Sequence, residues 1–238
     1  MLPKPVVDYR RFRLKQINTP EFSHLKLLIF WPVYVLLFGA IERDVFGDTY
    51  TPVEIFLDEW IPFCEWFVIP YTFWFFFLLG IHIYTLFYDI ASFRRLMTFL
   101  FIAYFGTLTI YLICPTCQNL RPTTFERDNL LVRYMRFYYT CDTNTNVCPS
   151  LHVAGSWAVV CGAWKSRHFS SRKWRIAFVI TALLISVSTC FVKQHSALDV
   201  ILAIPLCVLG WRVAMRLGSS SSSTPTQPKR KWRRRLSV

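Results

Sequence analysis

The chain has 238 residues, of which 54% are hydrophobic and 18% aromatic, and its formal net charge is +13. Residues 66–88 and 96–120 contain no charged side chain. Each stretch exceeds the roughly 20 residues that cross a ~30 Å hydrocarbon core. This pattern excludes an ordinary soluble domain, and we predict an integral membrane protein.

The positive charge is distributed unevenly. Most lysines and arginines fall in four places that alternate with apolar stretches, at residues 4–26, 94–95, 165–175 and 212–235. Such alternation is what the positive-inside rule predicts for cytoplasmic segments. We therefore attribute the charge to membrane topology and expect no nucleic-acid partner. The basic run at residues 229–235 is expected to meet anionic lipid at the cytoplasmic surface.

In chain order the apolar pattern predicts six membrane spans. Their approximate ranges are 25–42, 66–88, 96–114, 150–165, 175–192 and 197–216. No cleavable signal peptide is evident before the first span, which we expect to act as a start-transfer helix. The chain then divides into a basic cytoplasmic arm (1–24), a six-span domain (25–217) and a disordered Ser/Thr-rich, polybasic cytoplasmic tail (218–238).

Topology follows from placing the basic segments in the cytoplasm. Both termini then lie inside, whereas segment 43–65, the 115–149 loop and the 193–196 turn lie outside. Segment 53–65 is amphipathic and too short to span, so we expect it in the outer interface. The predicted fold is an all-α integral membrane six-helix bundle, in a bacterial plasma membrane, with its active site on the extracytoplasmic face.

A His–Asp pair begins the last predicted span. His195 and Asp199 are four residues apart, so they share one face of a helix. The carboxylate can accept a hydrogen bond from one ring nitrogen, which fixes the tautomer and leaves the other nitrogen free to attack. The alternative is that Asp199 only caps the helix or pairs with Lys193.

A second histidine begins the fourth predicted span. His152 follows Pro149 and Ser150, and Ser150 suits the N-cap of a helix whose free N–H groups can bind an anion. His152 would then protonate a leaving alkoxide as a general acid. The alternative is an interfacial histidine without a chemical role.

Two cations accompany the histidines. Arg121, before Pro122, ends the third span, and a guanidinium can hold two phosphoryl oxygens at once. Lys193 can add a second positive charge. The alternatives are an interfacial anchor for the arginine and a snorkelling side chain for the lysine. Arg121, His152 and His195 all fall on the predicted outer face, where they would suit phosphate-ester chemistry.

These fragments resemble the type-2 phosphatidic acid phosphatase superfamily of integral membrane enzymes, over roughly residues 90–216. The family signature Pro-Ser-x-His is complete at residues 149–152. The signature Ser-Arg-x5-His-x3-Asp is matched at Ser188, His195 and Asp199. The resemblance implies six helices and no required metal or cofactor.

The sequence departs from the family pattern at two cations. Thr189 stands where the third signature has arginine, and Cys114 stands where Lys-x6-Arg-Pro has lysine, although Arg-Pro is kept at 121–122. Lys193 is the only obvious replacement. Residues 192–199 look similar to the related inositol-phosphorylceramide and sphingomyelin synthases, which also lack that arginine and pass a head group to a lipid alcohol.

By this resemblance His195 is the nucleophile that forms a phosphohistidine, His152 is the acid and Asp199 orients the nucleophile. The expected phosphate-binding residues are Arg121, Ser150 and Lys193. We therefore expect a metal-independent lipid phosphatase acting on a lipid phosphate or diphosphate. A head-group phosphotransferase and a non-catalytic lipid-binding protein remain as alternatives, and the sequence decides neither the lipid nor the oligomeric state.

Five of the eight cysteines lie on the predicted outer side: Cys64, Cys114, Cys117, Cys141 and Cys148. In an oxidising compartment a disulfide, for example between Cys141 and Cys148, would staple the 115–149 loop. Five candidates leave the pairing open.

Overall fold

A computed structural model describes residues 5–43 and 49–220. The α-helices are α1 (Phe30–Ile41), α2 (Leu57–Trp60), α3 (Val68–Tyr88), α4 (Ile90–Ile113), α5 (Leu130–Cys141), α6 (Leu151–Trp164), α7 (Arg172–Phe191) and α8 (Ala197–Ser220). Two short strands, β1 (Thr51–Pro52) and β2 (Thr116–Cys117), pair in parallel. Short 3-10 helices are Tyr9–Arg11, Leu14–Gln16, Ser23–Ile29 and Glu65–Phe67. The predicted tail (218–238) begins in the last residues of α8, and its part beyond residue 220 lies outside the described residues.

The fold is mostly helical, as predicted, and it contains long apolar helices. Five are long and apolar enough to cross a membrane: Ser23–Ile41, Glu65–Tyr88, Ile90–Ile113, Arg172–Phe191 and Ala197–Leu217. The remaining predicted span, the fourth at residues 150–165, corresponds to α6, which is apolar but has only 14 residues, a rise of about 21 Å. By length, therefore, the structure supports five of the six predicted spans.

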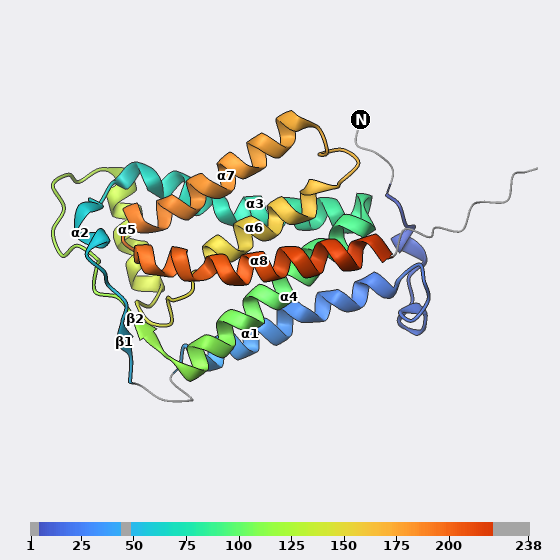
Figure 1. Ribbon diagram of the computed structural model, residues 1–238, viewed down its shortest axis with the longest axis horizontal. Helices are drawn as coiled ribbons and strands as arrows, with labels where there is room; N and C mark the ends of the chain where they lie inside the picture. The colour runs from blue at the N-terminus through green and yellow to red at the C-terminus, as the bar shows by residue number, and fades with distance from the viewer. Residues whose placement is uncertain (1–4, 44–48, 221–238) are drawn as a thin grey trace, which may run out of the picture.

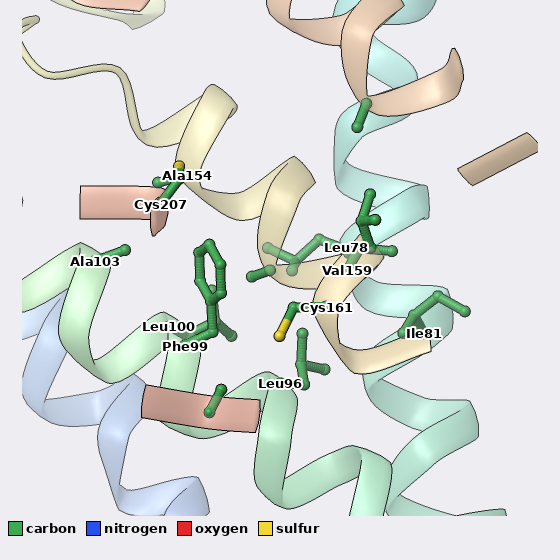
Figure 2. Close-up of a cluster of buried hydrophobic side chains, with 14 of the residues drawn as sticks. Leu78, Ile81, Leu96, Phe99, Leu100, Ala103, Ala154, Val159, Cys161 and Cys207 are labelled. Carbon is green, nitrogen blue, oxygen red and sulfur yellow. The ribbon is translucent and has the colours of Figure 1, made fainter. Parts of the chain in front are cut away.

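Helix α6 lies at the centre of the bundle, packed against α3, α4, α7 and α8. Figure 2 shows side chains of these helices converging on one apolar cluster, labelled at Leu78, Ile81, Leu96, Phe99, Leu100, Ala103, Ala154, Val159, Cys161 and Cys207. Small residues on α6 permit the close approach. A Cβ on Gly162, for example, would lie 3.0 Å from Leu96 Cβ.

The third predicted span begins earlier than expected. The sequence pattern placed Arg94 and Arg95 before the helix, but α4 starts at Ile90. The Asp89 side chain caps it by accepting from Ser92 N at 3.0 Å. Arg95 is buried and donates to Ser92 Oγ at 2.7 Å. A capped first turn and a side-chain partner therefore keep these two charges inside the helix rather than at its boundary.

The short elements gather at one end of the bundle. Figure 1 shows β1, β2, α2 and α5 beside the end of α7 and the start of α8. We call this the turn end, because residues 192–197 form the α7–α8 turn there. The connection predicted as a long polar loop contains α5, which is amphipathic: Val132 and Met135 are buried, whereas Arg133 and Arg136 are exposed. The turn end therefore has a folded polar cap.

Candidate active site

The predicted His–Asp pair is formed. His195 lies in the turn before α8, and its Nδ1 is 3.0 Å from Oδ2 of Asp199. Both side chains are buried, with 8% and 0% of their surfaces exposed. An ionised carboxylate can only accept a hydrogen bond, so Nδ1 of His195 carries the proton. Its Nε2 therefore keeps a free lone pair.

Asp199 also caps α8. Its Oδ2 accepts from Ser196 N at 3.1 Å, and it stands three residues after Ser196, the arrangement of the carboxylate half of a capping box. The two sequence-based readings of Asp199, orienting a histidine and capping a helix, are thus both realised. The proposed pairing with Lys193 is not, because Lys193 Nζ donates to the Asp58 carbonyl at 2.9 Å.

The second histidine meets the first. His152, the second residue of α6, places Nδ1 3.3 Å from Nε2 of His195. Because Nε2 of His195 holds a lone pair, Nδ1 of His152 carries the proton of this contact. Nε2 of His152 is buried and has no hydrogen-bond partner among the described residues. Asp199, His195 and His152 therefore form a continuous chain of three side chains.

Two aromatic rings of α3 hold His152. Tyr71 stacks on its ring at 4.6 Å between centroids, and Trp74 packs at 4.5 Å. From the sequence these aromatics fit an interfacial belt or the lining of a lipid groove, and their role against His152 was missed. Their spacing of three residues places them on one helical face. This spacing is the only local feature of the sequence from which their shared contact with His152 could have been predicted.

Ser150 is the N-cap residue of α6, as predicted, but its hydroxyl makes no capping hydrogen bond. It is fully buried, and Oγ has no partner among the described residues. Its backbone N–H donates to the Asp199 carbonyl at 3.1 Å. The carbonyl of Pro149 is held by Tyr111 Oη at 2.8 Å. These contacts fix the start of α6 against α8, and the hydroxyl of Ser150, two residues before His152, remains able to bind a ligand.

Arg121 does not contact the histidine pair. Its Nη1 donates to the carbonyls of Tyr139 and Asp142 at 3.2 and 3.0 Å. Its Nη2 donates to the Thr143 carbonyl and, at 2.7 Å, to Oε1 of Gln194. Burial lowers the pKa of Arg121 from its ordinary value, but a guanidinium stays charged. In this structure Arg121 ties the end of α5 to the turn.

Lys193 is also turned away from the histidines. It has a left-handed backbone, with φ of 54°, and its ammonium donates to the Asp58 carbonyl. Burial lowers the pKa of Lys193, and the nearby Asp58 opposes this shift. Both predicted phosphate-binding cations thus hold parts of the turn end together.

A cavity of about 620 Å³ opens beside the two histidines. His152, His195 and Gln194 line one end, and Trp31 and His82 line another part, between α1 and α3. Trp31 Nε1 donates to His82 Nε2 at 3.1 Å. Most of the remaining wall on α1 and α3 is aromatic or aliphatic, which suits a lipid chain.

The polar part of this cavity is acidic. The carboxyl-bearing residues that line it are Glu42 and Asp142, and no lysine or arginine is among its described lining residues. Glu42 accepts from Asn146 Nδ2 at 3.1 Å and from Thr143 Oγ1. This charge balance differs from the cation-rich site that the sequence predicted.

Metal sites and disulfides each need a particular arrangement of side chains. Within residues 5–43 and 49–220 no group of three or more His, Cys, Asp or Glu could hold a metal ion. All eight cysteines are free thiols, including Cys141 and Cys148, so the example disulfide is not formed. The exposed Cys141 lies at the end of α5, whereas Cys148 is buried before α6.

The arrangement can carry out nucleophilic chemistry. It presents an imidazole nitrogen with a lone pair, a carboxylate that fixes its tautomer and a second imidazole in contact with it. Among known protein families, the family model described as PAP2 superfamily matches residues 95–221, more than half of the chain. Comparisons with curated proteins and with solved structures found no match.

Proposed function

Because the chain belongs to the PAP2 superfamily, the type-2 phosphatidic acid phosphatases that act on lipid phosphates, we propose that it hydrolyses a lipid phosphate or diphosphate through a phosphohistidine. The observation that carries the proposal is the buried chain from Asp199 through His195 to His152 at the wall of a lipid-sized cavity.

In the first step Nε2 of His195 attacks phosphorus, and an N–P bond forms while the P–O bond to the lipid breaks. His152, in its imidazolium form, gives its proton to the departing oxygen. Asp199 stabilises the positive charge that then develops on the phosphorylated ring. Because Nδ1 of His152 lies 3.3 Å from the attacking nitrogen, the two rings must part when the phosphoryl group enters.

In the second step water attacks the phosphohistidine. Neutral His152 takes the proton of that water, the N–P bond breaks and inorganic phosphate leaves. We assign the phosphoryl oxygens to Ser150 Oγ and the first N–H groups of α6. Arg121 and Lys193 remain proposed phosphate-binding residues, and both must exchange their present carbonyl partners to take this role.

A head-group phosphotransferase is the second candidate. Cys114 and Thr189 occupy two cation positions of the family, and the hydroxyl of Thr189 donates to the Ser186 carbonyl at 2.7 Å. A phosphodiester carries one negative charge, whereas a phosphomonoester carries up to two. A site with fewer cations and two nearby carboxylates therefore suits a phosphodiester donor, with a lipid alcohol replacing water in the second step.

We further propose that the turn end faces the extracytoplasmic side of a bacterial plasma membrane, with both termini cytoplasmic. The charge alternation of the sequence supports this orientation. A non-catalytic lipid-binding role is disfavoured, because binding a lipid does not require a carboxylate–histidine–histidine chain.

The experiment that tests the proposal is phosphate release from a panel of lipids by the purified, detergent-solubilised protein. The panel contains phosphatidate, a polyprenyl diphosphate, and a phosphodiester lipid with diacylglycerol or ceramide as acceptor. We expect release that a metal chelator does not affect and that His195→Ala lowers at least 10³-fold, by analogy with the loss of other catalytic nucleophiles.

The other outcomes separate the candidates. A new phospholipid that appears only with the acceptor establishes the transferase. Activity that survives His195→Ala contradicts the nucleophile assignment. A protein that binds these lipids but forms no product is a binding protein.

A further inference from the structure

The turn that carries His195 is held by a segment far away in the sequence. From α2, which precedes the family-matched region of residues 95–221, a single buried carboxylate reaches the start of α8. We infer that Asp58 is a positioning residue for His195, an assignment that rests on the proposed phosphohistidine chemistry.

Asp58 makes three contacts with the turn. Its Oδ2 accepts from Ser196 Oγ at 2.6 Å, and its Oδ1 accepts from Ala197 N at 2.8 Å. Its carbonyl accepts from Lys193 Nζ at 2.9 Å. The contacts fall on both sides of His195, so movement of Asp58 would shift the turn on either side of the nucleophile.

The carboxylate also completes the end of α8. A helix leaves its first N–H groups without partners inside the helix, and a negative charge there is favourable. Asp58 satisfies the Ala197 N–H, while Asp199 satisfies that of Ser196. Asp58 has only 4% of its surface exposed, and in its absence water would not readily replace it.

Asp58 is itself fixed in place. Its Oδ2 accepts from Ile55 N at 2.9 Å, and the preceding strand β1 pairs with β2. From the β2 side Gln118 Nε2 donates to the carbonyls of Lys193 and Gln194 at 3.2 and 3.4 Å. The segment that carries Asp58 and the segment that carries Gln118 thus form one joined support for the turn.

The consequence for the reaction is geometric. Nε2 of His195 must lie in line with phosphorus, and a displacement of about 1 Å at a reacting group can cost about 10²-fold in rate. Asp58 does not line the cavity, so its loss should slow formation of the phosphohistidine without changing how tightly the lipid binds.

The test compares Asp58→Ala with Glu59→Ala in the full-length protein. Glu59 is the adjacent carboxylate of α2 and is exposed, so it controls for the removal of a charge from this helix. The measurements are kcat, KM and the rate of phosphohistidine formation, with the folded fraction determined by size-exclusion chromatography. We expect Asp58→Ala to lower kcat about 10²-fold with an unchanged KM, and Glu59→Ala to change neither.

Two further variants keep the test decisive if Asp58→Ala does not fold. Asp58→Asn retains one acceptor oxygen and should recover part of kcat. Ser196→Ala removes the hydroxyl that Asp58 binds and should also lower kcat. In the Asp58→Asn background this substitution should lower kcat less than it does in the wild-type protein.

The assignment is overturned if the folded Asp58 variants keep the kcat of the wild-type protein, or if KM rises while kcat is unchanged. A wild-type protein that forms no phosphohistidine overturns the proposed function and this assignment with it. A reactive wild type with unaffected Asp58 variants overturns the assignment alone.

Discussion

The turn that carries His195 and the first turn of α6, which carries His152, hold their histidines by different kinds of contact. His195 is held by hydrogen bonds, from its ring to Asp199 and from its backbone N–H to the Thr189 carbonyl. His152 is held between the ring of Tyr71, which stacks on it, and the tilted ring of Trp74, and one of its ring nitrogens has no partner among the described residues.

The difference fits two chemical tasks. A nucleophile needs one fixed tautomer, and a carboxylate hydrogen bond supplies it. A group that gives and takes a proton must keep its place in both protonation states, and stacking does not depend on which nitrogen carries the proton. The predictions below separate these two kinds of support.

The largest effect is expected on the hydrogen-bonded side. Asp199→Ala removes the partner of His195 Nδ1 and should lower the rate of phosphate release on the order of 10³-fold. It also removes a cap of α8, at a cost of about 1 kcal/mol in the free energy of unfolding. Single-turnover kinetics and thermal unfolding measure the two effects.

Asp199→Asn is the matched control. Oδ2 of Asp199 accepts from both Ser196 N and His195 Nδ1, so an amide oxygen in its place can keep the cap while the negative charge is lost. We expect Asn to restore stability but not activity. If Asn restores both, the reaction does not need the negative charge of Asp199.

A smaller effect is expected at the second histidine. His152→Asn keeps a donor toward His195 but removes the acid, so release from a lipid monophosphate should fall roughly 10²-fold. A diphosphate has a better leaving group, which needs less protonation, so His152→Asn should lower kcat less on a lipid diphosphate than on a lipid monophosphate. The comparison of kcat for the two substrates measures this, and equal losses for both would contradict the acid role.

The smallest effect is expected from disturbing the stack without touching either histidine. A Cβ on Gly155 would lie 2.6 Å from Tyr104 Oη and 2.9 Å from Trp74 Nε1. Gly155→Ala should therefore push Trp74 against His152, destabilise the fold by about 1–3 kcal/mol and lower kcat roughly 10-fold.

Gly80→Ala in α3 is the control, since no atom lies within 4 Å of its added Cβ. It should leave kcat unchanged. A Gly155→Ala protein with wild-type kcat would show that the stack does not position His152.

The sequence predicted those parts of the site that depend on local spacing. His195 and Asp199 share a helical face because they are four residues apart, and Ser150 occupies the predicted N-cap position. The predicted start of α4 lies too late in the chain. Arg94 and Arg95 indicated the end of a membrane span, although the helix begins before them with Asp89 as its N-cap.

The partners of the two cations could not be predicted in this way. Arg121 binds carbonyls at the end of α5, a helix that the polar 115–149 connection concealed. Lys193 binds the carbonyl of Asp58, which lies 135 residues away in the sequence, and no periodicity relates the two. Contacts of backbone carbonyls with distant side chains depend on the complete fold.

The shortness of α6 has a consequence for where the reaction takes place. Under the proposed topology the basic 165–175 connection lies at one membrane surface. A helix about 21 Å long would then begin about 9 Å below the opposite surface of a ~30 Å hydrocarbon core. His152 then lies beneath the head-group layer, and a lipid must draw its phosphate inward to react. Water is scarcer inside the hydrocarbon core than at the membrane surface. Under the proposed function, the depth of the site would therefore influence the balance between hydrolysis and transfer.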